Sequence, residues 1–238
     1  MSSSKISVAN EYEQNIFSTL GVKSKTVIIK NGINLDELDS KNIEFKKKYQ
    51  IEKKFILFLG RFSKVKGIDV LLNSINILKN KSNNLEFKTV IMGVDFGFEK
   101  EMLKMIEELR LSDDVIVIKK PLREEVVAAY KECEFLTLPS RWELSPLTPL
   151  EGFAFKKPVI STDIHGIPYT ITNNENGILI PLEDKLALAE AITEFMHDDY
   201  KREKYGNNGY ELVKNTCNSK IMAKKTLELY QDVIKNSK

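Results

Sequence analysis

Short apolar segments alternate with longer amphipathic segments through the middle of the chain. The short segments are rich in Ile, Leu, Val and Phe, which predicts strands buried on both faces. The predicted strands are Phe55–Gly60, Phe87–Gly93, Val115–Ile118, Glu134–Ser140, Pro158–Asp163 and Gly177–Ile180. Strands that alternate with helices predict βαβ units, so we expect an α/β fold with a doubly wound, mostly parallel, Rossmann-like sheet of about six strands.

The pattern differs at both ends of this region. Apolar residues at helical spacing predict a helix over residues 8–20, and the β-branched segment Lys25–Gly32 predicts a short strand. The polar segment Asp36–Gln50 is expected to be a surface helix or loop. After Pro181 the pattern predicts helices alone. The first of them is expected to have Leu186, Ala189, Ile192 and Met196 on one face, and the last is marked by Met222, Thr226, Leu229 and Val233.

Composition narrows the classes of function. The chain has 238 residues, 36 basic and 34 acidic, and a net charge of +2. This near balance does not by itself indicate a surface that binds nucleic acid. Its two cysteines lie far apart and suit free thiols in a reducing compartment. Its apolar runs are too short to span a bilayer, and its start lacks a secretion signal. We therefore expect a cytoplasmic protein, with peripheral membrane contact left open.

The loop after the first predicted strand carries two cations. Ligands of parallel sheets bind beyond the carboxyl ends of the strands, where the strand order reverses. Gly60 permits a sharp turn, and Arg61 and Lys66 follow it before the next helix. An arginine fork and a mobile lysine charge suit a diphosphate. An ordinary pair of surface cations is an equally good interpretation of this loop alone.

Two other loops end at the same edge of the predicted sheet. Gly93 permits close backbone approach after the second strand, although an ordinary turn is the simpler interpretation. Lys119, Lys120 and Pro121 follow the third strand, and their backbone could contact the edge of a base. The indication from sequence alone is weak for both loops.

Two glutamates follow the fourth strand, with seven residues between them. Pro146 suits a first helical turn, which places Glu143 on the loop before a helix and Glu151 within it. The exposed N–H groups near Leu147 and Thr148 would suit an anion. Each glutamate alone is better explained as a capping or surface acid. Together, opposite the cationic loop, they favour a ligand site.

The order of these motifs resembles one known family. A turn at Asn31–Ile33 is followed by GRFSKVKGIDVLL, IMG, PSRWELSPLTPLE, KKPVISTDIHG and NGILIPLED. With the pair of glutamates, this order resembles the C-terminal half of retaining glycosyltransferases of family 4 (group 1), which have the GT-B fold. The resemblance covers nearly the whole chain, from about Ile6 onward.

The resemblance implies a site for a nucleotide-diphospho-sugar donor, such as a UDP- or GDP-sugar, with no further cofactor. Arg61 and Lys66, next to Gly60, would hold the diphosphate. The backbone amides of Leu147 and Thr148 would support the distal phosphate. Such enzymes typically need no metal, because the Arg–Lys pair neutralises the leaving diphosphate.

The resemblance also divides the remaining roles. Glu151 would bond the ribose hydroxyls, and Gly93 and Lys120 would flank the base. Glu143 would be the catalytic residue, close to the donor sugar, where it bonds sugar hydroxyls or stabilises oxocarbenium charge. A glycosyl group would be transferred with retained anomeric configuration, as in hexosyltransferases.

The sequence departs from the family pattern at the proposed site. Ser145 and Pro146 replace a usual aromatic and glycine, and Pro149 adds another proline. Each proline removes an amide donor, so the phosphate contacts are expected to differ. His165 replaces the first glycine of a usual pair.

Family enzymes carry a further N-terminal domain that binds the acceptor. We expect residues 1–30 to be the tail of that missing domain plus a linker, 31–218 the nucleotide-sugar-binding domain, and 219–238 a C-terminal crossover helix. A sugar, lipid or glycan acceptor would bind the missing domain, so this chain alone should be inactive. The alternatives are a nucleotide-sugar binding module or another GT-B enzyme, such as an epimerase or phosphorylase.

Overall fold

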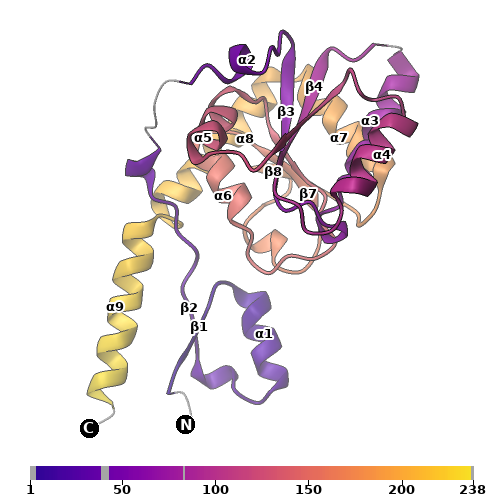
Figure 1. Cartoon of the computed structure of the whole chain (residues 1–238). Helices are drawn as coiled ribbons and strands as arrows, with labels where there is room; N and C mark the ends of the chain where they lie inside the picture. The colour runs from indigo at the N-terminus through magenta and orange to yellow at the C-terminus, as the bar shows by residue number, and fades with distance from the viewer. Residues whose placement is uncertain (1–3, 39–42, 83, 237–238) are drawn as a thin grey trace.

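A parallel sheet of six strands is the centre of the computed structural model, which describes residues 4–38, 43–82 and 84–236 (Figure 1). The order of the strands is β5-β4-β3-β6-β7-β8, and all neighbours are parallel. The strands are β3 (Lys54–Leu59), β4 (Phe87–Gly93), β5 (Val115–Lys119), β6 (Leu136–Leu138), β7 (Val159–Thr162) and β8 (Gly177–Ile180). The predicted α/β fold is confirmed, and β4 and β8 match their predicted bounds.

Helices cover both faces of the sheet. One face packs against α3 (Ile68–Ser82), α4 (Glu99–Glu108) and α7 (Lys185–His197). The other packs against α2 (Phe45–Lys48), α5 (Arg123–Glu132) and α6 (Leu147–Ala154). The helix α8 (Asp199–Asn215) contributes Tyr205 to the first core and Val213 to the second.

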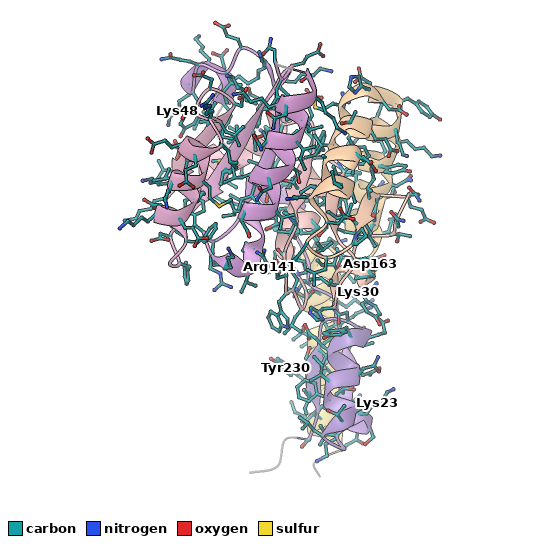
Figure 2. All side chains as sticks on the ribbon, turned by 90° about the vertical axis from the view of Figure 1, so that its right-hand side faces the viewer. Lys23, Lys30, Lys48, Arg141, Asp163 and Tyr230 are labelled. Atoms are coloured by element: carbon teal, nitrogen blue, oxygen red, sulfur yellow. The ribbon has the colours of Figure 1, made fainter. Side chains whose placement is uncertain are left out.

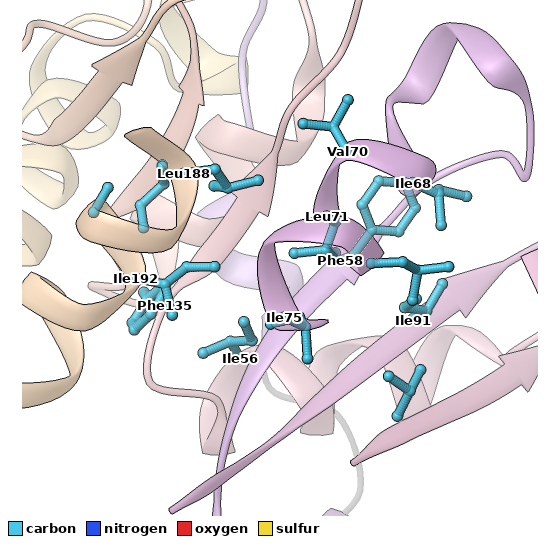
Figure 3. Packing of buried hydrophobic residues seen from close by; sticks show 14 of the residues in the cluster. Ile56, Phe58, Ile68, Val70, Leu71, Ile75, Ile91, Phe135, Leu188 and Ile192 are labelled. Carbon is cyan, nitrogen blue, oxygen red and sulfur yellow. The ribbon is translucent and has the colours of Figure 1, made fainter. Parts of the chain in front are cut away.

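The alternation of β3 explains why the sheet is buried on both sides. Ile56 and Phe58 lie in the core beneath α3, and Figure 3 shows them packed against Leu71 and Ile75. Phe55 and Leu57 lie in the core on the opposite face. Successive side chains of a strand point to opposite faces, so a continuous apolar run fills both cores at once.

A small N-terminal unit lies beyond the main sheet (Figure 1). It contains β1 (Ile6–Val8), α1 (Glu11–Thr19) and β2 (Thr26–Ile28), and β1 pairs with β2 in parallel. The prediction of one helix over residues 8–20 missed β1. The helix begins at Glu11 because the Asn10 side chain accepts the N–H of Glu13 at 2.9 Å.

The last helix, α9 (Ser219–Lys235), extends beside this N-terminal unit (Figure 1). The backbone of Ile33 joins the two: its N–H donates to Cys217 and its carbonyl accepts from Ser219. The final helix begins at Ser219, where the sequence predicted its start. The structure adds that both ends of the described chain meet at one side of the main sheet.

Two other predictions need correction. The segment Asp36–Gln50 was expected on the surface, yet Phe45 is fully buried against Phe55, with ring centroids 5.4 Å apart; residues 39–42 lie outside the described part. Leu186 was expected to share a face of α7 with Ala189 and Ile192 but is exposed, whereas those two are buried. Leu188 and Phe195 join them on the buried face of α7.

The carboxylate of Glu125 makes the stability of this fold sensitive to acid. It is buried and accepts from Lys48 Nζ at 2.6 Å, the Tyr49 hydroxyl at 2.6 Å and the Leu122 N–H at 2.7 Å. Burial alone would raise the pKa of Glu125, but these three bonds outweigh it and lower the pKa to about 2. The carboxylate therefore stabilises the fold above its ordinary pKa of 4.5, and this contribution is lost as the pH falls toward 2.

We expect Glu125→Gln to flatten this pH dependence. Between pH 4.5 and pH 2 the unfolded wild-type chain binds more protons, so its free energy of unfolding falls as the pH falls. As the pH falls, the free energy of unfolding of the variant should decrease by up to about 1.4 kcal/mol less per pH unit than that of the wild type. Urea unfolding across that range measures it. The exposed residue Glu190 supplies the control, because Glu190→Gln should keep the wild-type slope. Equal slopes in wild type and Glu125→Gln would contradict the assignment.

Candidate functional site

The loops after β3 and β6 meet at the carboxyl edge of the sheet. β3 and β6 are neighbours, and the chain leaves them toward opposite edges of the sheet, so the strand order reverses between them. This is the place where parallel α/β sheets bind ligands. The N–H of Arg141 donates to Val65 at 2.7 Å and joins the two loops. Figure 2 shows Arg141 at the edge that faces the N-terminal unit.

The side chain of Arg141 fixes these loops further. Its two terminal nitrogens each donate to one carboxylate oxygen of Asp69 at 2.8 Å, and its Nε donates to Glu183 at 2.6 Å. Burial would raise the pKa of Asp69, but Arg141 and then Lys64 hold it below its usual value. Sequence reasoning did not identify Arg141. Its contact partner lies far away in the chain, so local pattern could not reveal the pair.

A cleft of about 590 Å³ opens at this edge. Five of the residues predicted to bind the donor line it: Gly60, Arg61, Gly93, Lys120 and Thr148. The remaining lining comes from Leu59, Val94 and Pro121. The structure therefore brings residues from three strand ends and one helix start to a common cavity.

Close backbone contacts shape the floor of the cleft. A side chain at Gly93 would place its Cβ 1.8 Å from the carbonyl oxygen of Gly60, so this position requires glycine. Lys120 has a left-handed backbone, with φ of 51°, and its N–H donates to the Gly93 carbonyl at 2.7 Å. These contacts hold the loops after β3, β4 and β5 together.

The two predicted phosphate cations differ in their surroundings. Lys66 Nζ lies 2.5 Å from Glu143 Oε1, which also accepts from the Ser140 hydroxyl at 2.9 Å. The side chains of Lys66 and Glu143 are only 15% and 10% exposed, so this ion pair is largely removed from water. Arg61 is exposed and lies over the ring of Phe96, 4.9 Å from its centroid. Lys66 is thus held in place, whereas Arg61 lies at the rim.

The second glutamate lies inside α6. Glu151 accepts from the Tyr130 hydroxyl at 2.7 Å and from Arg123 at 3.0 Å. Thr148 precedes it by three residues on the same helical face and lines the cleft, whereas Glu151 itself is not among the lining residues. Both predicted glutamates therefore lie at the carboxyl edge of the sheet.

The start of α6 differs slightly from the prediction. Pro146 is the N-cap and not part of the first turn, since its ψ of 137° is extended. The helix begins at Leu147, and within the described residues no side chain caps its N-terminus. Pro149 has no N–H, so the backbone donors at this end are those of Leu147 and Thr148.

An aromatic cluster forms the rim next to Glu143. His165 has a left-handed backbone with φ of 48°, which agrees with its standing at a position where glycine is usual. Its Nδ1 shares a hydrogen bond of 2.8 Å with the Tyr12 hydroxyl, and Trp142 lies beside it, half exposed. The N-terminal unit is therefore tied to this rim.

Two absences apply to the described residues. Over residues 4–38, 43–82 and 84–236, no group of three or more His, Cys, Asp or Glu side chains could hold a metal ion. None of the helices in those ranges is long and apolar enough to span a bilayer.

The cleft, with Arg61 and Lys120 in its lining, lies at the reversal point of the strand order, where α/β domains bind ligands. The family model for glycosyl transferases group 1 matches residues 39–212, which is more than half of the chain. The chain belongs to this family. The family resemblance noted from the sequence is confirmed.

Curated relatives agree with this assignment. The chain is 28% identical over 241 residues to the capsular polysaccharide biosynthesis glycosyltransferase CapM of Staphylococcus aureus, covering 98% of this chain and 60% of CapM. It is 31% identical over 153 residues to the D-inositol 3-phosphate glycosyltransferase of Corynebacterium urealyticum, covering 63% of this chain and 36% of that protein. The chain thus spans about three fifths of the length of CapM.

Solved structures confirm the fold. Sucrose-phosphate synthase from Thermosynechococcus elongatus superposes with a TM-score of 0.87 at 23% identity, over 99% of this chain and 59% of that one. HepE from Anabaena in complex with UDP also superposes with a TM-score of 0.87, at 18% identity, over 97% of this chain and 64% of that one. These neighbours are GT-B glycosyltransferases, so the main sheet is one half of a GT-B fold.

Proposed function

We propose that this chain is the donor-binding half of a retaining glycosyltransferase that uses a nucleotide-diphospho-sugar. The observation that carries the proposal is the Lys66–Glu143 pair, 2.5 Å apart, on the loops that follow β3 and β6. A largely buried cation on a loop at the carboxyl edge of the sheet, together with a helix N-terminus, suits a diphosphate. A carboxylate beside the same cation suits the developing charge on the sugar.

The diphosphate would lie between Lys66 and the start of α6. Lys66 would leave Glu143 in part to contact a phosphate oxygen, and Arg61 would swing from Phe96 to contact another. The amides of Leu147 and Thr148 would donate to the distal phosphate. This arrangement would neutralise the leaving group without a metal ion.

The nucleoside would fill the cleft. The base would lie against the backbone of Gly93 and Lys120, which are hydrogen-bonded to each other, and the ribose would lie near Glu151. UDP is the first donor nucleotide to test, since solved structures of HepE contain UDP and UDP-glucose. A GDP-sugar is the second candidate.

The transfer step would break the bond between the anomeric carbon and the distal phosphate oxygen. The diphosphate would leave with both electrons, and its negative charge would fall on Lys66, Arg61 and the helix amides. Glu143 would bond the sugar hydroxyls or stabilise the oxocarbenium-like charge. A hexosyl group would pass to the acceptor with retained anomeric configuration.

The acceptor would bind elsewhere in a larger enzyme. CapM, of which this chain matches 60%, is described as acting in capsular polysaccharide biosynthesis. We propose that residues 1–30 are the end of an N-terminal acceptor domain plus a linker, that 31–218 form the donor domain, and that 219–238 cross back. A sugar, lipid or glycan would be the acceptor, in the cytoplasm or at a membrane surface.

We expect this chain alone to transfer no sugar, because one wall of the active site lies on the other domain. Release of UDP from UDP-glucose, measured with a set of acceptors, should stay at the rate without enzyme. Adding the N-terminal domain of a full-length relative such as CapM, as a fusion, should restore transfer, and NMR of the product should show retained configuration.

Three results would contradict the proposal in different ways. Robust turnover by the chain alone would refute the requirement for a second domain. Binding of UDP with no transfer by any fusion would favour a nucleotide-sugar binding module. Interconversion of the donor sugar without an acceptor would favour an epimerase, and phosphate-dependent release of sugar 1-phosphate a phosphorylase.

A further inference from the structure

A buried tyrosine contacts the glutamate proposed to bind ribose. The hydroxyl of Tyr130 donates to Glu151 Oε2 at 2.7 Å, and Arg123 donates to Glu151 Oε1 at 3.0 Å. Tyr130 is fully buried on α5, and its ring stacks on Phe155 with centroids 5.5 Å apart and planes 9° apart. The proposed transfer step makes no use of Tyr130.

The tyrosine fixes the carboxylate more firmly than the arginine does. The side chain of Arg123 is 61% exposed, and exposed ion pairs hold a geometry weakly. The Tyr130 ring is locked by packing, so its hydroxyl sets the direction of Oε2. Burial first, and then the charge of Glu151, raise the pKa of Tyr130 well above its usual value, so the hydroxyl remains a donor at neutral pH.

The remaining capacity of Glu151 points to a particular ligand group. An ionised carboxylate has two oxygens with about four acceptor positions, and Tyr130 and Arg123 occupy one on each oxygen. One position on each oxygen is then left for a ligand. Since the carboxylate only accepts, a matching ligand must present two neighbouring donors, as the two adjacent hydroxyls of a ribose do.

We propose that Tyr130 is a positioning residue that orients Glu151 to recognise the vicinal diol of a ribose, and so makes the site discriminate ribonucleoside from deoxyribonucleoside diphosphates. This inference rests on the proposed function, because it takes Glu151 as the ribose contact. It adds that selectivity for the 2′-hydroxyl depends on a residue on α5 that touches no ligand.

The chain supplies a matched control. Tyr49 donates to Glu125 at 2.6 Å, and Lys48 donates to the same carboxylate, so a tyrosine and a cation again share one glutamate, here through its Oε1 alone. Glu125 lies on α5, whereas Glu151 lies on α6, the helix whose residue Thr148 lines the cleft. Tyr49→Phe removes the same hydroxyl from a similar setting without touching the proposed ribose contact.

Calorimetric titration with UDP and with 2′-deoxy-UDP tests the inference, with GDP and 2′-deoxy-GDP used if GDP binds better. The wild type should bind the ribonucleotide at least about tenfold more tightly than the deoxyribonucleotide, because the latter lacks one hydrogen bond to a charged group. Tyr130→Phe should lower this ratio of affinities to about threefold or less. The affinity for UDP should fall, whereas the affinity for 2′-deoxy-UDP should change by less than about twofold. Tyr49→Phe should keep the wild-type ratio.

A second variant covers the case in which Tyr130→Phe does not fold. Glu151→Asp keeps the charge and Tyr130 but shortens the side chain, so the carboxylate cannot reach Tyr130 and the ribose together. The ratio should fall in this variant as well. An unchanged ratio in whichever variant folds would overturn the positioning role, as would equal weakening of both nucleotides, which is the mark of a structural effect alone.

The outcomes separate this inference from the proposed function. If the wild type discriminates between the nucleotides and Tyr130→Phe still does, Glu151 keeps its assignment and the role of Tyr130 is refuted. If the wild type binds UDP and 2′-deoxy-UDP equally, the ribose role of Glu151 fails, and the inference fails with it. If neither UDP nor GDP binds, both are refuted.

Discussion

Replacing Lys66 with alanine is expected to weaken the binding of UDP by about 100-fold or more and to destabilise the fold. The affinity falls because a phosphate loses a charge-assisted contact, worth about 1.5–3 kcal/mol, and because the loop loses its anchor. The stability falls because Glu143 stays buried without its cation, which costs about 3–5 kcal/mol. Calorimetric titration and urea unfolding measure the two effects.

Lys64 is the control for this variant. It lies on the same short 3-10 helix, Lys64–Lys66, but its side chain is 56% exposed and pairs with Asp69 and Glu101. Because exposed ion pairs contribute at most about 1 kcal/mol, Lys64→Ala should change stability little and UDP affinity by less than about fivefold. Equal losses in both variants would show that charge near the cleft, rather than Lys66 itself, binds the phosphate.

Replacing Glu143 with glutamine is expected to change binding and transfer in opposite directions. In the free protein Glu143 competes with the phosphate for Lys66, since Glu143 Oε1 lies 2.5 Å from Lys66 Nζ. Glutamine releases that lysine, so UDP should bind about tenfold more tightly if the competition costs about 1.4 kcal/mol. In a two-domain fusion that transfers sugar, the same change should slow transfer by about 100- to 1,000-fold.

Glu101 gives the matched control, because it pairs with Lys64 at 3.2 Å and both side chains are 56% exposed. Glu101→Gln should alter neither UDP affinity nor the transfer rate of the fusion. Titration of the chain and initial rates of the fusion measure the two effects. Weaker UDP binding by Glu143→Gln, or an unchanged transfer rate, would refute the proposed role.

The fold could be predicted because its strands are continuous apolar runs. A strand buried on both faces needs apolar residues at every position, as in Phe55–Gly60, so its limits are visible in the sequence. β1 was missed because it has only three residues, with Ser7 between two apolar ones, and carries no such signal. The burial of Phe45 was missed because it depends on packing against Phe55 of β3. The polar residues next to Phe45 in the sequence do not indicate that contact.

The site could be predicted in outline for a related reason. Parallel strands end at one edge, so residues that follow different strands meet there, as Gly60, Gly93 and Lys120 do. The pairs within the site could not be predicted. Arg141 with Asp69 and Tyr130 with Glu151 depend on how side chains from separate elements pack, and no local pattern encodes that contact.

The central claim is that this cleft binds a nucleoside diphosphate through Lys66. Its most direct test is calorimetric titration of the wild type and of Lys66→Ala with UDP, GDP and uridine, in buffer with EDTA. We predict saturable one-to-one binding of UDP or GDP by the wild type, weaker binding of uridine, and a loss of about 100-fold in the variant. No binding of either diphosphate by the folded wild type, or equal affinity in the variant, would contradict the claim.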